Sequence, residues 1–166
     1  MKKIWIMLLV SCCLLLGACK GTENPQENGQ TDTKNDRTDV VYVGNTEVAL
    51  NGAADEVLEA LGEPLDYRES KSCLYDGYDK TYTYQDVVII TSPIQGKEVI
   101  TAITVLSDKV SNKLGVGIGS SVENVKAAYG TDSLEITEYC CIWEGEFGVA
   151  FYLADGVVTE IEIYVL

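Results

Sequence analysis

Two stretches of the chain that lie 68 positions apart share one pattern of residues. Residues 51–62 read NGAADEVLEALG and residues 119–130 read GSSVENVKAAYG, so each has small residues, then an acidic residue, a valine and a closing glycine. The pattern predicts a short helix, because Ser120 and Glu123 have the spacing of a capping box and a terminal glycine favours a left-handed stop. The repetition predicts a domain made of two copies of one unit.

Each predicted helix has one apolar side. Apolar residues recur there at helical spacing, namely Val57, Leu58 and Leu61 in the first helix and Val122, Val125 and Tyr129 in the second. Helices this short have little stability alone, so we expect their apolar sides to dock on a sheet.

The two copies are also alike beyond the helices. Residues 73–77 (CLYDG) match residues 141–145 (CIWEG), and residues 100–105 (ITAITV) match residues 158–163 (VTEIEI). We therefore expect repeat one at about residues 48–106 and repeat two at about residues 116–166, each a helix followed by three strands. The predicted strands cover residues 67–75, 80–91 and 99–106 in the first repeat and residues 135–143, 148–153 and 157–165 in the second.

Turn signals separate these strands. Asp76-Gly77 and Asp155-Gly156 are typical of tight hairpins, so neighbouring strands are expected to be antiparallel. The predicted fold class is α+β: two tandem α-β-β-β repeats that form a mainly antiparallel sheet, with two helices packed on one face.

Alternation along the predicted strands assigns side chains to the two faces of the sheet. In the last strand the helix side receives Val157, Thr159, Ile161, Ile163 and Val165, and the opposite, open side receives Glu160, Glu162 and Tyr164. By the same rule the helix side also receives Leu74, Ile142, Val149, Phe151 and Leu153, and the open side receives Cys73, Tyr75, Cys141, Trp143, Ala150 and Tyr152.

The N-terminus has the features of an export signal. Two lysines precede a largely apolar run at residues 4–16, which is shorter than the ~20 residues a membrane-spanning helix needs. The run ends in Leu16-Gly17-Ala18-Cys19, which resembles the box of bacterial lipoprotein precursors that is cut before its Cys. The resemblance implies a signal peptide at residues 1–18 and lipidation of Cys19. It places the protein in the cell envelope, on the outer face of the cytoplasmic membrane or in the periplasm of a host with an outer membrane.

Residues 19–40 are expected to be a tether between the anchor and the domain. Their side chains are almost all polar, so they cannot bury enough surface to offset the entropy of ordering. The folded domain is then residues 41–166, which hold seven of the 12 basic and 21 of the 26 acidic residues. Such a surface makes nucleic acid and anionic lipid poor partners and leaves membrane contact to the lipid anchor. Cationic proteins, amines and divalent metals remain open.

The repeated helix pattern is similar to one found in two groups of exported bacterial domains. One is the small lipoprotein of the outer-membrane β-barrel assembly machinery, which has a single copy. The other is the β-lactamase inhibitor protein family, which has two tandem copies with helices on one face of a shared sheet. Uncharacterised lipoproteins of anaerobic Gram-positive bacteria are also similar, including stretches like residues 72–77 and 115–119. The resemblance implies a binding module that uses the open sheet face and identifies no target.

Residue types of common catalytic and metal sites are scarce. The chain has no His, which removes the usual general base and the usual zinc ligand. Glu160 and Glu162 have a spacing that a glycosidase pair could use, and residues 76–79 with Asp86 offer carboxylates for calcium without the spacing of an EF-hand loop. We interpret both groups as solvated, and we predict no catalytic residue, no metal site and no cofactor.

Three cysteines follow the expected tether. An exported location permits disulfides, and Cys73 and Cys141 occupy matching positions, so a bridge between them is a candidate if their strands are adjacent. Cys140 points to the other side and is expected to be a small buried residue.

The open face is the best candidate for function. Aromatic and acidic side chains are predicted to gather there: Tyr75, Trp143, Tyr152, Tyr164, Glu160 and Glu162. Large amphipathic rings on a rigid sheet are typical of interface hot spots, although another element could also cover them. The sequence thus predicts an exported protein-binding or scaffolding module, with another envelope or secreted protein as its partner. The alternatives are an inhibitor or modulator of a secreted enzyme, and a small-ligand or cation carrier or a hydrolase that uses carboxylates alone.

Overall fold

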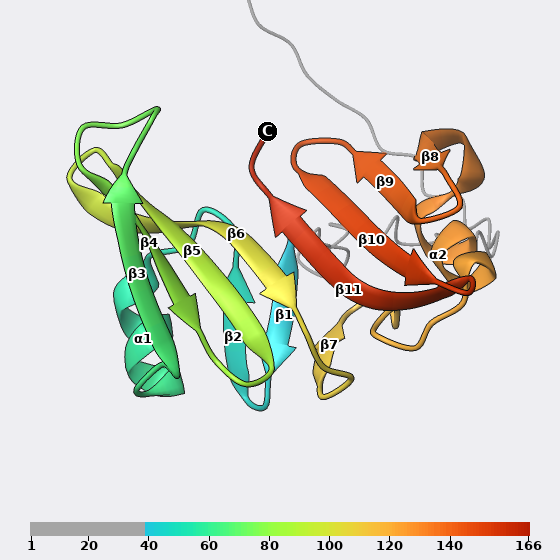
Figure 1. Ribbon diagram of the computed structural model, residues 1–166, viewed down its shortest axis with the longest axis horizontal. Coiled ribbons are helices and arrows are strands. Elements are labelled where there is room, and N and C mark those ends of the chain that lie inside the picture. The colour runs from blue at the N-terminus through green and yellow to red at the C-terminus, as the bar shows by residue number, and fades with distance from the viewer. Residues whose placement is uncertain (1–38) are drawn as a thin grey trace, which may run out of the picture. The chain divides into compact units, whose positions relative to one another are not determined.

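The computed structural model describes residues 39–166, so Cys19 and the expected signal peptide lie outside the described residues (Figure 1). Two antiparallel sheets and two short helices make up this part of the chain. The helices are α1 (Ala54–Leu61) and α2 (Val122–Tyr129), and a single 3-10 turn, η1 (Thr131–Ser133), follows α2. Neither helix has the length and apolar character needed to cross a membrane.

The larger sheet has eight strands in the order β3-β4-β5-β6-β11-β10-β9-β8. Every neighbouring pair is antiparallel. Its strands are β3 (Asp66–Lys71), β4 (Tyr78–Thr83), β5 (Val87–Ile94), β6 (Lys97–Val105), β8 (Leu134–Ile136), β9 (Cys140–Glu144), β10 (Gly148–Ala154) and β11 (Val157–Tyr164).

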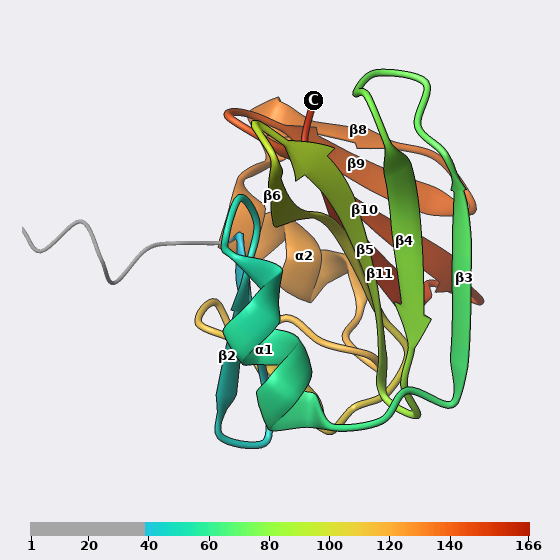
Figure 2. The same cartoon turned by 90° about the vertical axis from the view of Figure 1, so that its left-hand side faces the viewer.

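The smaller sheet was not expected from the sequence. It consists of β1 (Val40–Val43), β2 (Thr46–Ala49) and β7 (Val110–Asn112), in the order β2-β1-β7. Val40, Val41 and Val48 are at most 2% exposed, so this sheet supplies part of the core. Helix α1 packs beside β2, as Figure 2 shows, and it also contacts β6.

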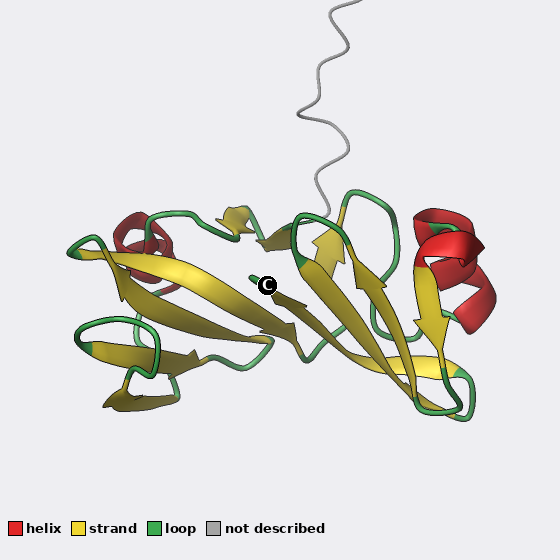
Figure 3. Cartoon of the chain, turned by 90° about the horizontal axis from the view of Figure 1, so that it is seen from above, coloured by secondary structure: helices red, strands yellow, loops and turns green. Residues whose placement is uncertain are grey.

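The predicted α+β class is therefore wrong. Strands hold 51% of the described residues and helices only 14%, and a three-stranded sheet belongs to the fold in addition to the two helices. The predicted α-β-β-β unit is also wrong, because each helix is followed by four strands of the large sheet. Seen from above, the two helices lie at opposite ends of a domain that is mostly strand (Figure 3).

One turn in each half explains the extra strand. Residues 80–91 were expected to form one strand, but the Tyr84 amide donates to the Val87 carbonyl and closes a turn between β4 and β5. Residues 135–143 are divided in the same way at Thr137, whose hydroxyl accepts from the Cys140 amide. Neither turn has the Asn-Gly, Asp-Gly or Pro signal that identifies a hairpin in a sequence.

The helix ends agree closely with the pattern of the sequence. Gly62 and Gly130 end the two helices at φ 77° and 80°, which L side chains adopt with difficulty. The capping residue of α2 differs from the prediction, because the hydroxyl of Ser121, and not that of Ser120, accepts from the Asn124 amide.

Strands β6 and β11, which occupy corresponding positions in the two repeats, each carry a β-bulge at a threonine. The register of β6 against β5 shifts at Thr101, and that of β11 against β10 shifts at Thr159. Each threonine hydroxyl donates to a carbonyl of the neighbouring strand, at 3.4 Å from Thr101 and 3.3 Å from Thr159. The bulge also corrects an assigned face: Val158 is 1% exposed and Val157 is 39% exposed, the reverse of strict alternation.

The core lies on one face of the large sheet. Its buried side chains from that sheet are Val87, Ile89, Ile100, Ile103, Val105, Cys141, Val149, Phe151, Leu153, Val158, Ile161 and Ile163. The alternate residues of the same strands point to the opposite side, which we call the open face. Val88, Ile90, Ile142, Tyr152 and Tyr164 lie there, and none of them belongs to the core or packs against it.

Candidate binding surface

Four of the six residues predicted to bind a partner lie together on the open face. Tyr152 of β10 is paired with Glu160 of β11, and Glu162 and Tyr164 follow at alternate positions along β11. Two further glutamates share this face, Glu135 of β8 and Glu144 of β9. We call the set Glu135, Glu144, Tyr152, Glu160, Glu162 and Tyr164 the tyrosine–glutamate patch.

Tyr164 is placed by a glycine. Gly148 is paired with Tyr164 across β10 and β11, and a Cβ atom added at Gly148 would lie 2.3 Å from Cζ of the Tyr164 ring. The ring therefore covers the backbone of β10 at a position where any other residue would displace it. Such aromatic cover of a strand glycine holds the ring against the sheet.

Tyr152 is placed by a hydrogen bond. Its hydroxyl donates to Oε2 of Glu162 at 3.1 Å, and this bond, followed by burial, raises the pKa of Tyr152. Burial, followed by the charges of Glu144 and Glu162, raises the pKa of Tyr164. Both phenols are thus neutral near pH 7, and the negative charge of the patch comes from its glutamates.

Trp143 and Tyr75 are not part of the patch. Trp143 is paired with Val149 on the core side of the sheet, where its ring contacts the rings of Tyr129 and Phe147 at 5.9 and 5.2 Å. Tyr75 lies in the loop after β3, which ends at Lys71, instead of on a strand. The match between residues 73–77 and 141–145 misled the assignment, because the first stretch is a loop and the second is mostly β9.

Glu135, Glu144 and Gly148 belong to the candidate surface but were not predicted from the sequence. Alternation within β9 places Cys140, Ile142 and Glu144 on one face, as the structure does. The signal that could have found this face is Trp143, because large aromatic side chains are highly buried on average, whereas the Glu144 that follows is rarely buried. Once Trp143 faces the core, Glu144 must face outward.

The candidate disulfide between Cys73 and Cys141 is also wrong. Cys73 is exposed in the loop between β3 and β4, whereas Cys141 is 0% exposed in β9, five strands away from β4 in the sheet. Strands are spaced by about 4.8 Å, so the two Cα atoms are much farther apart than the ~7 Å that a disulfide allows. All three cysteines of the described residues are free thiols, and Cys140, expected to be buried, is half-buried on the open face.

Thiol labelling should follow this order of exposure. We expect a maleimide reagent to modify Cys73 first and Cys140 at least about tenfold more slowly, with Cys141 modified only when the core opens. Burial raises the pKa of both Cys140 and Cys141, which lowers their thiolate fraction further. Peptide mapping of the labelled full-length chain over time measures the three rates separately. Labelling of Cys141 as fast as Cys73 in the folded protein would contradict the assigned faces.

A separate polar cluster surrounds Glu98 on the core side of the large sheet, in strands β4, β5 and β6. The carboxylate of Glu98 accepts from Lys80 Nζ and Tyr82 Oη, both at 2.6 Å, and from Thr91 Oγ1 at 2.8 Å. Burial alone would raise the pKa of Glu98, but the three donors together lower it. Burial and the bond to Glu98 raise the pKa of Tyr82. All the carboxylate's close partners belong to the chain itself, so the cluster is better explained as a tie between β4, β5 and β6.

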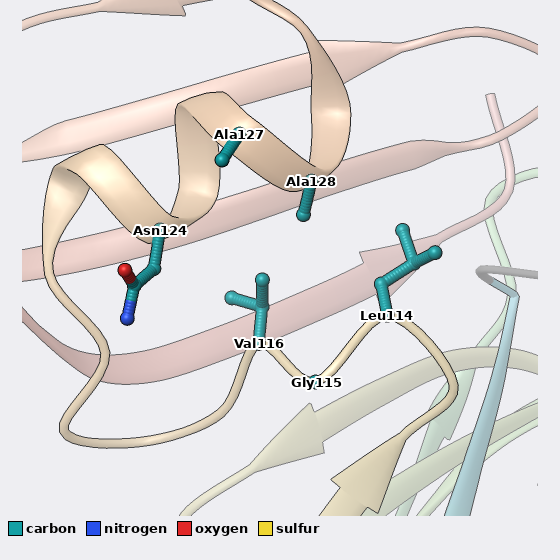
Figure 4. A pocket seen from close by; sticks show the side chains of 6 residues that line it. All are labelled: Leu114, Gly115, Val116, Asn124, Ala127 and Ala128. Atoms are coloured by element: carbon teal, nitrogen blue, oxygen red, sulfur yellow. The ribbon is translucent and has the colours of Figure 1, made fainter.

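Two hollows lie in the second half, away from the patch. One, of about 300 Å³, runs between α2 and the segment before it and is lined by Leu114, Gly115, Val116, Asn124, Ala127 and Ala128 (Figure 4). The other, of about 430 Å³, is lined by Glu138, Tyr139, Leu153, Ala154, Asp155 and Gly156. No patch residue lines either hollow. Among residues 39–166 no three acidic or cysteine side chains converge closely enough to hold a metal ion.

No protein-family model matches the chain, and no curated protein or solved structure is significantly similar to it. The chemistry of the patch therefore carries the functional proposal.

Proposed function

We propose that this chain is an exported, lipid-anchored module that binds another envelope or secreted protein through the tyrosine–glutamate patch. The observation that carries the proposal is the position of two tyrosine rings on a sheet face whose side chains take no part in the core. Tyr152 is 39% exposed although it is a large aromatic residue within a central part of the sheet. The lipoprotein-like residues 16–19 support the anchor.

Both rings are held in place before any partner arrives. Gly148 fixes the ring of Tyr164, and Glu162 fixes the hydroxyl of Tyr152. A preorganised aromatic side chain loses little conformational entropy on binding, so more of its contact energy contributes to affinity. A hydrolase that uses Glu160 and Glu162 is less well supported, because these side chains lie on an open sheet face where water is not excluded.

Site-specific photo-cross-linking tests the proposal in cells that make the full-length chain. Benzoylphenylalanine in place of Tyr152 or Tyr164 is expected to give the same protein adduct from both positions. Tyr78 provides the control, because it is 56% exposed on the other face of β4 and so is even more accessible than Tyr152. Equal adduct from position 78, or none from positions 152 and 164, would contradict the proposal.

The Gly148→Ala variant adds a test that removes no side chain. The new methyl group is expected to displace the Tyr164 ring and to reduce the adduct from position 152 by about fivefold, since anchor residues contribute much of the energy of an interface. The backbone at Gly148 has no positive φ, so the fold should persist, as circular dichroism would show. An undiminished adduct with an intact fold would count against Tyr164 as an anchor.

A further inference from the structure

Charge is distributed unequally over the open face. On β3–β6 the charged side chains of that face are Asp66, Arg68, Asp79 and Lys97, two of each sign, and Arg68 pairs with Asp66 at 2.8 Å. On β8–β11 the charged side chains of that face are Glu135, Glu144, Glu160 and Glu162, all acidic. One face of one sheet is thus neutral over one half and strongly negative over the other.

Residues 39–166 provide no counter-charge for this negative half. Strands β8–β11 contain no Lys or Arg, and Lys126 is the only basic residue among residues 116–166. Lys126 lies on α2 and its nearest carboxylate is that of Glu123, at 3.9 Å. None of the four patch glutamates makes an ion pair within the described residues, so their charges are available to a partner.

The spacing of the carboxylates favours a polypeptide over a single cation. Glu135 is paired with Ile142, Ile142 with Ala150, and Ala150 with Glu162, so the two glutamates lie at the ends of one row across four strands. Three strand spacings separate them by about 14 Å. That distance is too long for shared coordination of one ion, which agrees with the lack of a metal-binding cluster in residues 39–166. It matches about four residues of an extended chain.

We infer that the partner segment that contacts the tyrosine–glutamate patch is basic and contains arginine. This inference rests on the proposed binding function and adds the chemistry of the partner. Guanidinium groups pair with the separated carboxylates and stack on the faces of Tyr152 and Tyr164, which favours Arg over Lys. The other half of the open face contributes shape without net charge.

An octa-arginine peptide is the probe for a direct test with the full-length chain. We expect it to bind more tightly than octa-lysine, and octa-glutamate not to bind. A variant with Glu135→Gln, Glu160→Gln and Glu162→Gln should bind octa-arginine about tenfold more weakly, because charge pairs across an interface guide and stabilise association. The matched control is Glu56→Gln, Glu59→Gln and Glu63→Gln, three exposed positions on or next to α1 with the same change in net charge. The control should bind within about twofold of the wild type.

Equal losses in the two variants would show attraction by net charge alone and would overturn the inference, as would unchanged binding in the patch variant. The photo-adduct at position 164 separates this failure from that of the proposed function. An adduct that persists in the patch variant overturns the basic partner and leaves the binding function standing. Complete absence of the adduct in the wild type overturns both.

Discussion

Replacement of Phe151 by alanine is expected to lower the free energy of unfolding by about 3–5 kcal/mol. Phe151 is among the largest fully buried side chains, at 0% exposure, and its ring contacts Tyr129 of α2 edge-on at 5.0 Å. It is paired with Cys141 on one side and Ile161 on the other, so its loss opens a cavity between the central strands and the helix. Domains of this size have a total stability of about 5–15 kcal/mol, so little would remain.

The adjacent residue on the same strand supplies the control. Tyr152 points to the open face, and Tyr152→Ala should cost at most about 1 kcal/mol because little core surface is lost. Denaturant unfolding of both variants measures the difference from the midpoints, provided that the slopes agree with that of the wild type. A cost for Tyr152→Ala equal to that for Phe151→Ala would contradict the assignment of the two faces.

The sequence pattern predicts helices at about residues 53–61 and 121–129, which agree with α1 and α2 to within one residue. The C-terminal ends of the helices depend on local chemistry, namely the closing glycines Gly62 and Gly130. Each helix also has an apolar side that must pack on a core. The inward positions of Ile161 and Ile163 were also correct, because strict alternation holds along this part of β11. Such features depend on short stretches of sequence.

The errors arose where a non-local contact decides the structure. The hairpin of β1 and β2 is stabilised by β7, which pairs with β1 from about 70 positions later, so composition alone assigned part of it to a tether. Thr159 begins a bulge that reverses the faces of Val157 and Val158, and a one-residue bulge has no reliable sequence signal. Tyr152, Glu160, Glu162 and Tyr164 were correctly predicted to share one face. Trp143 and Tyr75 were wrongly placed on that face.

The sequence similarity between the two repeats corresponds to similar structure in some segments only. Helices and last strands correspond, including the bridges from Ala53 to Val99 and from Ser121 to Val157. The stretches at 73–77 and 141–145 look equally similar, yet one is a loop and the other is mainly a strand. Sequence similarity over five residues does not fix backbone conformation, because tertiary contacts outweigh local preference in strands.

Glu98→Gln is expected to lower the free energy of unfolding by about 1–2 kcal/mol near neutral pH, because hydrogen bonds to a partly buried charged group are stronger than neutral ones. The Glu98 side chain is 20% exposed and that of Lys80 is 31% exposed, so solvent weakens this ion pair only in part. The side-chain amide of the introduced Gln has a single accepting atom, its oxygen. Lys80 and Tyr82 would then compete for that oxygen.

The loss should depend on pH in a defined direction. The donors hold the pKa of folded Glu98 below its ordinary 4.5, so its contribution to stability is present above that pH and disappears as pH falls through the folded value. The bond to Glu98 raises the pKa of Lys80 above 10.5, so the contribution of Lys80 persists through neutral pH and disappears only in strong alkali. The difference in unfolding free energy between wild type and Glu98→Gln should therefore be constant from about pH 6 to 9 and shrink toward about pH 3.

Urea unfolding at several pH values measures this difference, with Glu69→Gln as the matched control. Glu69 lies on the exposed strand β3 and, within residues 39–166, its carboxylate accepts a hydrogen bond only from Tyr67, so its replacement should change stability by less than about 0.5 kcal/mol. A constant difference down to about pH 3 would mean that the charge of Glu98 contributes nothing and that shape alone explains the loss. A shrinking difference instead shows that an internal ion pair ties β4 to β6 in the neutral half, whereas the patch glutamates of the other half make no ion pair with any residue that the structure describes.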